Sequence, residues 1–127
     1  MDRVSKYWPE TLSILRIVIG LVFLEHGTAQ LFGFPHTAMA QPSMGTRLWF
    51  QGIIELVGGA LFAVGFLTRP VAFILAGDMA VAYFMAHAPK DFFPILNGGD
   101  GAILYCFIFL IFIVAGPGRW AADGSAK

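Results

Sequence analysis

Charged residues and cysteine are both scarce in this sequence. Asp, Glu, Lys and Arg make up 13% of its 127 residues, whereas a soluble domain carries about a quarter. The formal net charge is zero, so no basic or acidic excess indicates a nucleic-acid partner. The single cysteine, Cys106, can form no disulfide within the chain and supplies no C-x-x-C pair, which excludes dithiol chemistry within the chain. These shortages argue against a soluble globular domain.

Apolar residues make up 57% of the chain and gather in four segments. The segments run over about residues 12–34, 46–67, 70–88 and 99–115, each near the roughly 20 residues with which a helix crosses a bilayer. Backbone polar groups in lipid have to be satisfied within their own segment, which favours helices over open strands. We therefore predict an all-α integral membrane protein, a four-helix transmembrane bundle in a single domain over residues 1–127. The connection between the second and third segments is very short, so we expect those two helices to pack as an antiparallel hairpin.

Basic residues are distributed unequally between the two ends of the predicted bundle. One end carries Arg3, Lys6, Arg69, Arg119 and Lys127. The other end carries Arg47 and Lys90. Because cytoplasmic loops are enriched in Lys and Arg, both termini are predicted to lie in the cytoplasm of a prokaryotic cell. Residues 38–40 (AMA) resemble a signal-peptidase site but lie well beyond the first apolar run, so we expect a retained membrane helix.

Polar side chains within or near the predicted helices are the candidates for function. They are Arg16, Glu25, His26, Gln30, Gln51, Glu55, Asp78 and His87. Each is costly in lipid and is expected to face the bundle interior and to find a partner. At a rise of about 1.5 Å per residue, Arg16 and Asp78 both lie in the inner half of the membrane. We expect these two to form a structural ion pair between helices.

A second group of polar residues is predicted in the outer half of the membrane. Glu25, His26 and Glu55 lie at a similar depth, and His87 lies slightly closer to the outer face. Two carboxylates at one depth repel each other, so one of them is expected to hold a proton or a cation. The group is compatible with hydrogen bonds that only join helices, with a site for a quinone or small polar ligand, and with proton or solute conduction. A haem or metal held by both histidines is also compatible, but their spacing is unspecific and no metal site is assigned.

Several short motifs follow one another along the chain. They are residues 26–33 (HGTAQLFG), 55–61 (ELVGGAL), 65–69 (GFLTR), 87–90 (HAPK), 97–100 (NGGD) and 116–119 (GPGR). In this order the motifs resemble the DoxX family of four-helix membrane proteins, over nearly the whole chain. The family usually has Lys where this chain has Gln30, so any anion-binding role of that lysine does not carry over. Asn97 is expected to cap the last helix, and the glycines after it would let backbone N–H groups approach a ligand at the outer rim.

The resemblance implies redox work at the membrane with a quinone as electron acceptor. Family members include the membrane subunit of an archaeal thiosulfate:quinone oxidoreductase. The leading hypothesis is a membrane subunit of a redox system that binds a quinone or similar small ligand in the outer half of the bundle. Its candidate ligand-binding residues are Glu25, His26, Gln30, Glu55, His87 and Asn97.

Within this hypothesis, Glu55 and His26 would hydrogen-bond the oxygens of the ligand, and Glu25 or His87 would handle its proton. No catalytic residue is assigned, because electron transfer would need a cofactor or a partner subunit. Besides the lipid bilayer, the expected partner is a second copy of the chain or a redox subunit. One alternative is a non-catalytic membrane anchor or assembly subunit. Another is a small transporter or proton-coupled channel, which the lack of inverted repeats disfavours.

Overall fold

The computed structural model describes residues 2–37 and 41–124, so residues 38–40 and Lys127 lie outside the described part. Over these ranges the chain forms helices and no strands. The elements are α1 (Asp2–Ser5), α2 (Trp8–Phe32), α3 (Arg47–Val64), α4 (Thr68–Ala82), α5 (Pro94–Asn97) and α6 (Asp100–Ala115). A π-helical turn (Tyr83–His87) and a 3₁₀ turn (Ala88–Lys90) extend α4. The predicted all-α class is confirmed.

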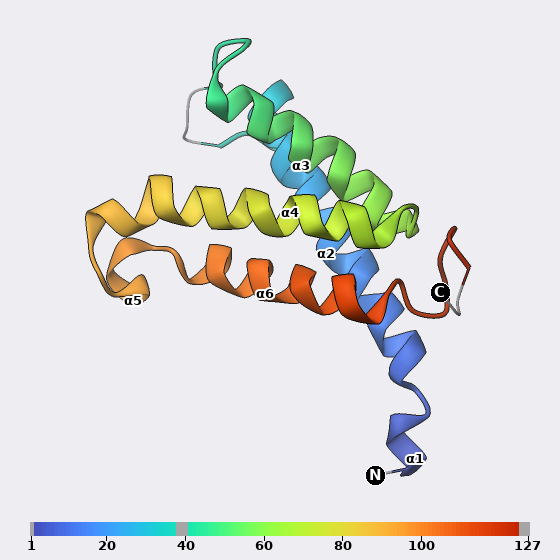
Figure 1. Ribbon diagram of the computed structural model, residues 1–127. Coiled ribbons are helices and arrows are strands. Elements are labelled where there is room, and N and C mark those ends of the chain that lie inside the picture. Colours follow the sequence, from blue (N-terminus) through green and yellow to red (C-terminus); the bar gives the residue numbers. More distant parts are fainter. Residues whose placement is uncertain (1, 38–40, 125–127) are drawn as a thin grey trace.

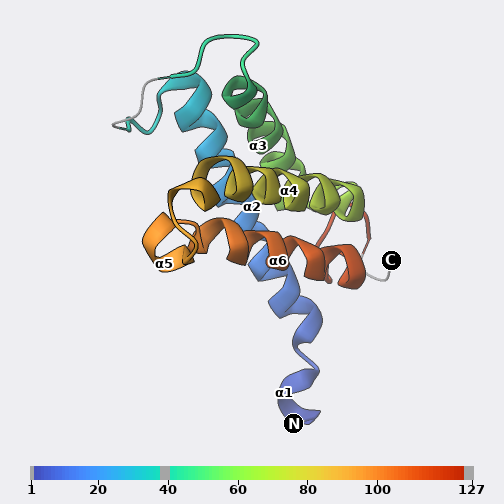
Figure 2. The same ribbon diagram turned by 60° about the vertical axis from the view of Figure 1, so that its left-hand side comes forward.

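The helices form two antiparallel pairs that cross each other (Figures 1 and 2). The first pair is α2 with α3, and the second is α4 with α6. Helices α3 and α4 do touch beside their short connection, but each packs more extensively against another helix. The antiparallel hairpin expected between the second and third spans is therefore only a minor contact. The two helix pairs cross, and this directs α4 away from α3.

Small residues bring the backbones of α2 and α3 together. A Cβ atom added at Gly20 would lie 2.5 Å from the amide nitrogen of Ala63, and one added at Gly27 would lie 2.5 Å from that of Leu56. No side chain fits in such a space, so the helices approach backbone to backbone as they do in small-residue membrane interfaces. This contact also sets the register, since it places Gly27 beside Leu56, the residue after Glu55.

Within the described residues, three helical segments are long and apolar enough to cross a membrane: Trp8–Phe32, Arg47–Val64 and Thr68–Lys90. The fourth apolar helix, α6, is shorter, with 16 residues. The first helix begins four residues before the predicted start because Pro9 occupies its first turn, where no backbone N–H is needed. The three long segments end at Phe32, Val64 and Lys90, within three residues of the predicted ends at 34, 67 and 88.

Phenylalanine rings fill the place where the two helix pairs cross. Phe109 of α6 packs edge-on against Phe23 of α2 and Phe62 of α3, with ring centroids 4.9 and 5.1 Å apart. Phe62 also meets Phe112 at 4.9 Å, and all four rings are buried. Edge-to-face pairs add to the free energy of burial. Large apolar side chains on the outer surface, such as Phe73 and Phe107, are exposed as expected for contact with lipid.

Candidate functional site

Arg16 is fully buried near the end of the bundle that is predicted to face the cytoplasm, called the inner end below. Its side chain binds backbone carbonyls there. Its Nε donates to the carbonyl oxygen of Phe62 at 2.9 Å, and its Nη2 donates to that of Ala63 at 3.3 Å. Its guanidinium also donates to the carbonyls of Pro117 and Trp120 in the segment after α6. Carbonyls in the last turn of a helix lack partners within the helix and carry its negative dipole end. Arg16 therefore closes the end of α3 and ties it to the C-terminal segment.

The predicted ion pair between Arg16 and Asp78 is wrong. The donors of Arg16 are directed at the four carbonyls, while the side chain of Asp78 contacts that of Glu55 on α3. Equal depth suggested the pairing, but depth does not fix which way a side chain points around its helix. Because the helix pairs cross, the side chain of Asp78 points toward α3, and Arg16 binds carbonyls of the C-terminal segment instead.

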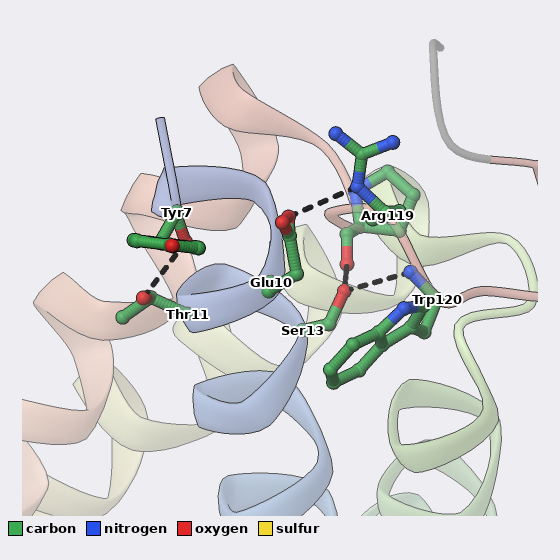
Figure 3. A network of polar contacts seen from close by, with 7 residues as sticks. Tyr7, Glu10, Thr11, Ser13, Arg119 and Trp120 are labelled. Atoms are coloured by element: carbon green, nitrogen blue, oxygen red, sulfur yellow. Dashed lines mark hydrogen bonds and ion pairs between the residues drawn. The ribbon is translucent and has the colours of Figure 1, made fainter. Parts of the chain in front are cut away.

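The C-terminal segment, residues 116–124, runs beside the first turns of α2, where Arg119 and Trp120 meet Glu10 and Ser13 (Figure 3). The hydroxyl of Ser13 accepts a hydrogen bond from the backbone N–H of Trp120 at 2.9 Å and donates to the Pro117 carbonyl at 3.3 Å. Arg119 forms an ion pair with Glu10 at 2.9 Å (Figure 3). These contacts hold the segment against the first turns of α2.

Asp123 caps the start of α4 from this C-terminal segment. Its carboxylate oxygens accept hydrogen bonds from the backbone N–H groups of Leu67 at 2.8 Å and Thr68 at 2.9 Å. The hydrogen bond from the Thr68 backbone, with that from Leu67, holds the pKa of Asp123 below its usual value. A carboxylate at a helix N-terminus also faces the positive end of the dipole. The inner end of the bundle is thus a structural clamp.

A cavity of about 520 Å³ lies between α2, α3, α4 and α6 in the half of the bundle away from the C-terminal segment, called the outer half after the predicted orientation. Phe23 and Tyr105 form part of its wall, and their rings meet edge-on at 5.0 Å. The polar and charged side chains that line it include His26, Gln30, Arg47, Gln51, Glu55 and His87. Four of the six predicted ligand-binding residues are thus brought together around one space: His26, Gln30, Glu55 and His87.

Glu25 and Asn97, the other two predicted ligand-binding residues, do not line this cavity. Glu25 is exposed on the outer surface of α2, on the same face as the exposed Leu21 and Val18. Asn97 is buried, and its amide donates to the carbonyl of Asp91 at 3.0 Å and to the hydroxyl of Tyr83 at 3.2 Å. Asn97 therefore organises the outer connection.

Glu55 is the most deeply buried polar group of the cavity, with 3% of its surface exposed. Its carboxyl group lies beside the side chain of Gln51, one helical turn earlier, and beside that of Asp78 on α4, and it interacts with both. The other oxygen of Asp78, Oδ2, is buried and has no partner within the described residues. Two carboxyl groups in contact require a proton between them, since two anions would repel each other. The carboxylate partner predicted for Glu55 was Glu25, but the structure supplies Asp78.

Both histidines of the cavity are held by backbone carbonyls. The Nδ1 atom of His26 lies 2.8 Å from the Val22 carbonyl oxygen, and the Nδ1 atom of His87 lies 3.0 Å from that of Asn97. The ring of His26 also stacks on Phe23, with centroids 5.8 Å apart. These contacts fix the orientation of both rings at the wall of the cavity.

Five polar or charged residues of the cavity were missed as ligand contacts by the sequence analysis: Thr37, Gln41, Arg47, Gln51 and Tyr105. Gln51 was noted as an intramembrane polar residue, and its position one turn before Glu55 was a usable signal. Arg47 was counted only as a loop charge. Tyr105 lies in an apolar helix where no pattern distinguished it. Among residues 2–37 and 41–124, no three His, Cys, Asp or Glu side chains are grouped so that they could hold a metal ion.

Comparisons with known proteins place the chain among membrane proteins. The model of the DoxX family matches residues 11–88. The chain is 42% identical to an uncharacterized protein of Haemophilus influenzae, over 97% of this chain and 96% of the relative. It is 29% identical to the uncharacterized membrane protein Rv3486 of Mycobacterium tuberculosis, over 91% and 80%. It is 26% identical to the inner membrane protein YqjF of Escherichia coli, over 87% of each.

No solved structure matches the chain. The membrane relatives and the apolar helices together identify a prokaryotic multi-pass membrane protein. The predicted localisation is thereby confirmed, and the surface of the helix bundle contacts the lipid bilayer.

Proposed function

The chain belongs to the DoxX family, and we propose that it is a membrane subunit of a redox system that binds a quinone-type ligand in its outer cavity. The observation that carries this proposal is the convergence of Glu55, His26 and His87 on one cavity with a partly aromatic wall. Small-molecule sites combine apolar walls with a few placed polar groups, and their volumes run from about 300 to 1,000 Å³. The cavity of about 520 Å³ lies within that range.

A quinone-type ring suits the two kinds of surface in the cavity. Its flat apolar face can pack on Phe23 and Tyr105, as aromatic rings do. A hydroxyl attached to the ring can donate a hydrogen bond to Glu55 or to an imidazole. In this proposal the chain binds and orients the ligand, while a partner subunit or a cofactor carries the electrons. The experiments therefore have to detect a bound quinone-type molecule.

The first test is native mass spectrometry of the protein extracted from its own membranes in mild detergent. We expect a retained mass of quinone size or a co-extracted redox subunit. A protein that carries only phospholipid would count against the proposal and would favour a purely structural role for the polar residues.

The second test measures binding to the purified protein in phospholipid nanodiscs by calorimetry. The probe is ubiquinone-1, offered separately in its oxidised and reduced forms. Glu55→Gln and His26→Ala should each weaken binding of the tighter form about tenfold, as the loss of one hydrogen bond does. Glu25→Gln is the matched control, because Glu25 lies outside the cavity. Unchanged affinity in both cavity variants would remove the site assignment.

A further inference from the structure

We propose that the outer cavity binds the reduced, hydroxyl-bearing form of its quinone-type ligand in preference to the oxidised form, an inference that rests on the function proposed above. The two forms have the same ring and differ in hydrogen-bonding character. A quinol carries O–H groups that donate, whereas the carbonyl oxygens of a quinone only accept. The hydrogen-bonding character of the cavity wall therefore decides which form fits.

The two histidines present acceptors to the cavity. A backbone carbonyl can only accept, so the Nδ1 atoms of His26 and His87 must carry the protons that they donate to Val22 and Asn97. In the neutral imidazole this leaves Nε2 of each ring with a lone pair. Both rings line the cavity. A ligand that meets these nitrogens has to supply the proton of the hydrogen bond.

Glu55 is also an acceptor, because the proton that it shares with Asp78 belongs to Asp78. Its carboxyl group interacts with the amide of Gln51 and with the carboxyl of Asp78, while Asp78 has a buried oxygen without a partner in the described part of the chain. A buried oxygen without a partner costs less on a neutral carboxylic acid than on an anion. The shared proton therefore belongs to Asp78, which donates it to Glu55. Glu55 is left as a carboxylate at the cavity wall.

The donors around the cavity are the amides of Gln30, Gln41 and Gln51, the hydroxyls of Thr37 and Tyr105, and Arg47. One N–H of the Gln41 amide is engaged, since it donates to the Leu31 carbonyl at 2.9 Å. The amide of Gln30 donates to the Leu48 carbonyl at 2.6 Å, and that of Gln51 interacts with Glu55. Arg47 lies in the exposed first turn of α3, about 12 Å along the helix from Glu55. The Tyr105 hydroxyl can donate or accept, so it favours neither form. The inner part of the cavity is thus rich in acceptors.

A quinol matches this arrangement, and a quinone does not. A quinol hydroxyl can donate to the Glu55 carboxylate or to a histidine Nε2. The carbonyl oxygen of a quinone in the same place would face a carboxylate or a lone pair, with no proton between them. Sites built around buried polar groups reject analogues that leave those groups unpaired. Because a single hydrogen bond to a charged group is at stake, the reduced form should bind at least about tenfold more tightly.

The test compares duroquinol with duroquinone, which has nearly the same shape, and with the larger dimethyl ether of duroquinol, which has no O–H. Each is titrated into the protein in phosphatidylcholine nanodiscs without oxygen, and binding is measured by calorimetry. For the native sequence, duroquinol should bind at least about tenfold more tightly than either other probe. Comparing the probes on the unaltered protein does not depend on whether a variant folds.

Variants then assign the preference to Glu55. Glu55→Gln places an amide that can donate at the cavity wall, so the preference for duroquinol should fall to about twofold or less. Asp78→Asn retains an N–H donor toward Glu55, so the preference for duroquinol should keep its direction. Glu25→Gln makes the same chemical change on the outer surface of α2 and serves as the control.

The outcomes separate this inference from the function on which it rests. Duroquinone binding as tightly as duroquinol to the native protein would overturn the inference and leave a quinone-type site in place. Binding of none of the three probes would overturn both. A full preference for duroquinol that persists in Glu55→Gln would remove Glu55 as the group that discriminates.

Discussion

The guanidinium of Arg16 donates to the carbonyl oxygen of Phe62 at 2.9 Å, across the interface between α2 and α3. The same side chain also holds carbonyls of the segment after α6. A buried cation is costly when it lacks partners. In this chain its partners are helix-end carbonyls, which need donors in their turn. Arg16 therefore supplies hydrogen-bond donors to the carbonyls at the end of α3, and these carbonyls supply acceptors to its buried guanidinium.

Replacing Arg16 with Met should strongly destabilise the fold. The change removes the Arg16 donors from the carbonyls of Ala63 and Trp120, while those of Phe62 and Pro117 keep one donor each, from the Gly65 N–H and the Ser13 hydroxyl. The lost hydrogen bonds from a buried cation should together cost at least about 3 kcal/mol. Arg119→Met is the control, since its ion pair with Glu10 is largely exposed and should contribute at most about 1 kcal/mol. Thermal unfolding in detergent measures both. Equal melting temperatures for the two variants would contradict the structural role of Arg16.

Asp123 should make the stability of the fold depend on acidity. Because the pKa of Asp123 is lowered in the folded state, its contribution is fully present above the ordinary Asp value of about 4. That contribution is lost as the pH falls through the lower folded value. The melting temperature of Asp123→Asn should be below that of the native protein at pH 7, and the difference should shrink at pH 3. A difference that is the same at both pH values would count against the capping role.

Gly20→Ala should separate α2 from α3, because the new Cβ would lie 2.5 Å from the backbone of Ala63. We expect a loss of at least about 2 kcal/mol, in the upper range for overpacking. Gly77→Ala is the matched control: no atom lies within 4 Å of its added Cβ, and Ala favours the helix by about 1 kcal/mol. Melting temperatures of the two variants should therefore shift in opposite directions. A shift in the same direction would show that backbone contact is not what limits position 20.

Asn97→Ala should loosen the outer connection that holds His87. The substitution removes donors to Tyr83 and Asp91 and the acceptor for the Gly99 backbone N–H, which lies 2.7 Å from Oδ1. A loss of about 2 kcal/mol is expected for such a buried amide. Asn97→Asp keeps the acceptor and should be milder. If Asn97→Ala had the same melting temperature as the native protein but no longer bound the ligand, Asn97 would be a ligand contact and not a structural residue.

Membrane orientation remains a prediction and can be tested with two exposed positions, one in α1 before α2 and one in the loop between α2 and α3. In a Cys106→Ser background, Met44→Cys should react with a membrane-impermeant maleimide added outside intact cells, and Val4→Cys should not. Both side chains are exposed, at 82% and 73%. The reverse labelling pattern would place both termini outside the cytoplasm.

Helix content and membrane insertion could be predicted from the sequence because both depend on local quantities. A run of apolar residues long enough for a bilayer is visible in the chain itself, and glycine or proline at its ends limits its length. Thus α2 ends at Gly33, which adopts a left-handed conformation, and α3 ends at Gly65 in the same way. Depth along a helix was also predictable, and it identified His26, Glu55 and His87 as neighbours in height.

The partner of each buried polar side chain was not predictable from depth. Arg16 and Asp78 were predicted at a similar depth in the inner half of the membrane, yet the structure does not bring them together. Asp78 meets Glu55 instead, and Glu25 faces outward although it shares the depth of Glu55. Direction around the helix axis depends on how the helices cross, and the crossing depends on contacts between residues far apart in the chain.

The sequence by itself determined that this chain is a helical membrane protein of the DoxX family and where its helices run. The tertiary structure alone decided that Arg16 closes the end of α3, that Asp78 pairs with Glu55, and that His26 and His87 share a cavity. Apolar length and helix ends are properties of consecutive residues. Pairing depends on the close approach of α2 to α3 and on the crossing of the two helix pairs, which exist only once the chain has packed.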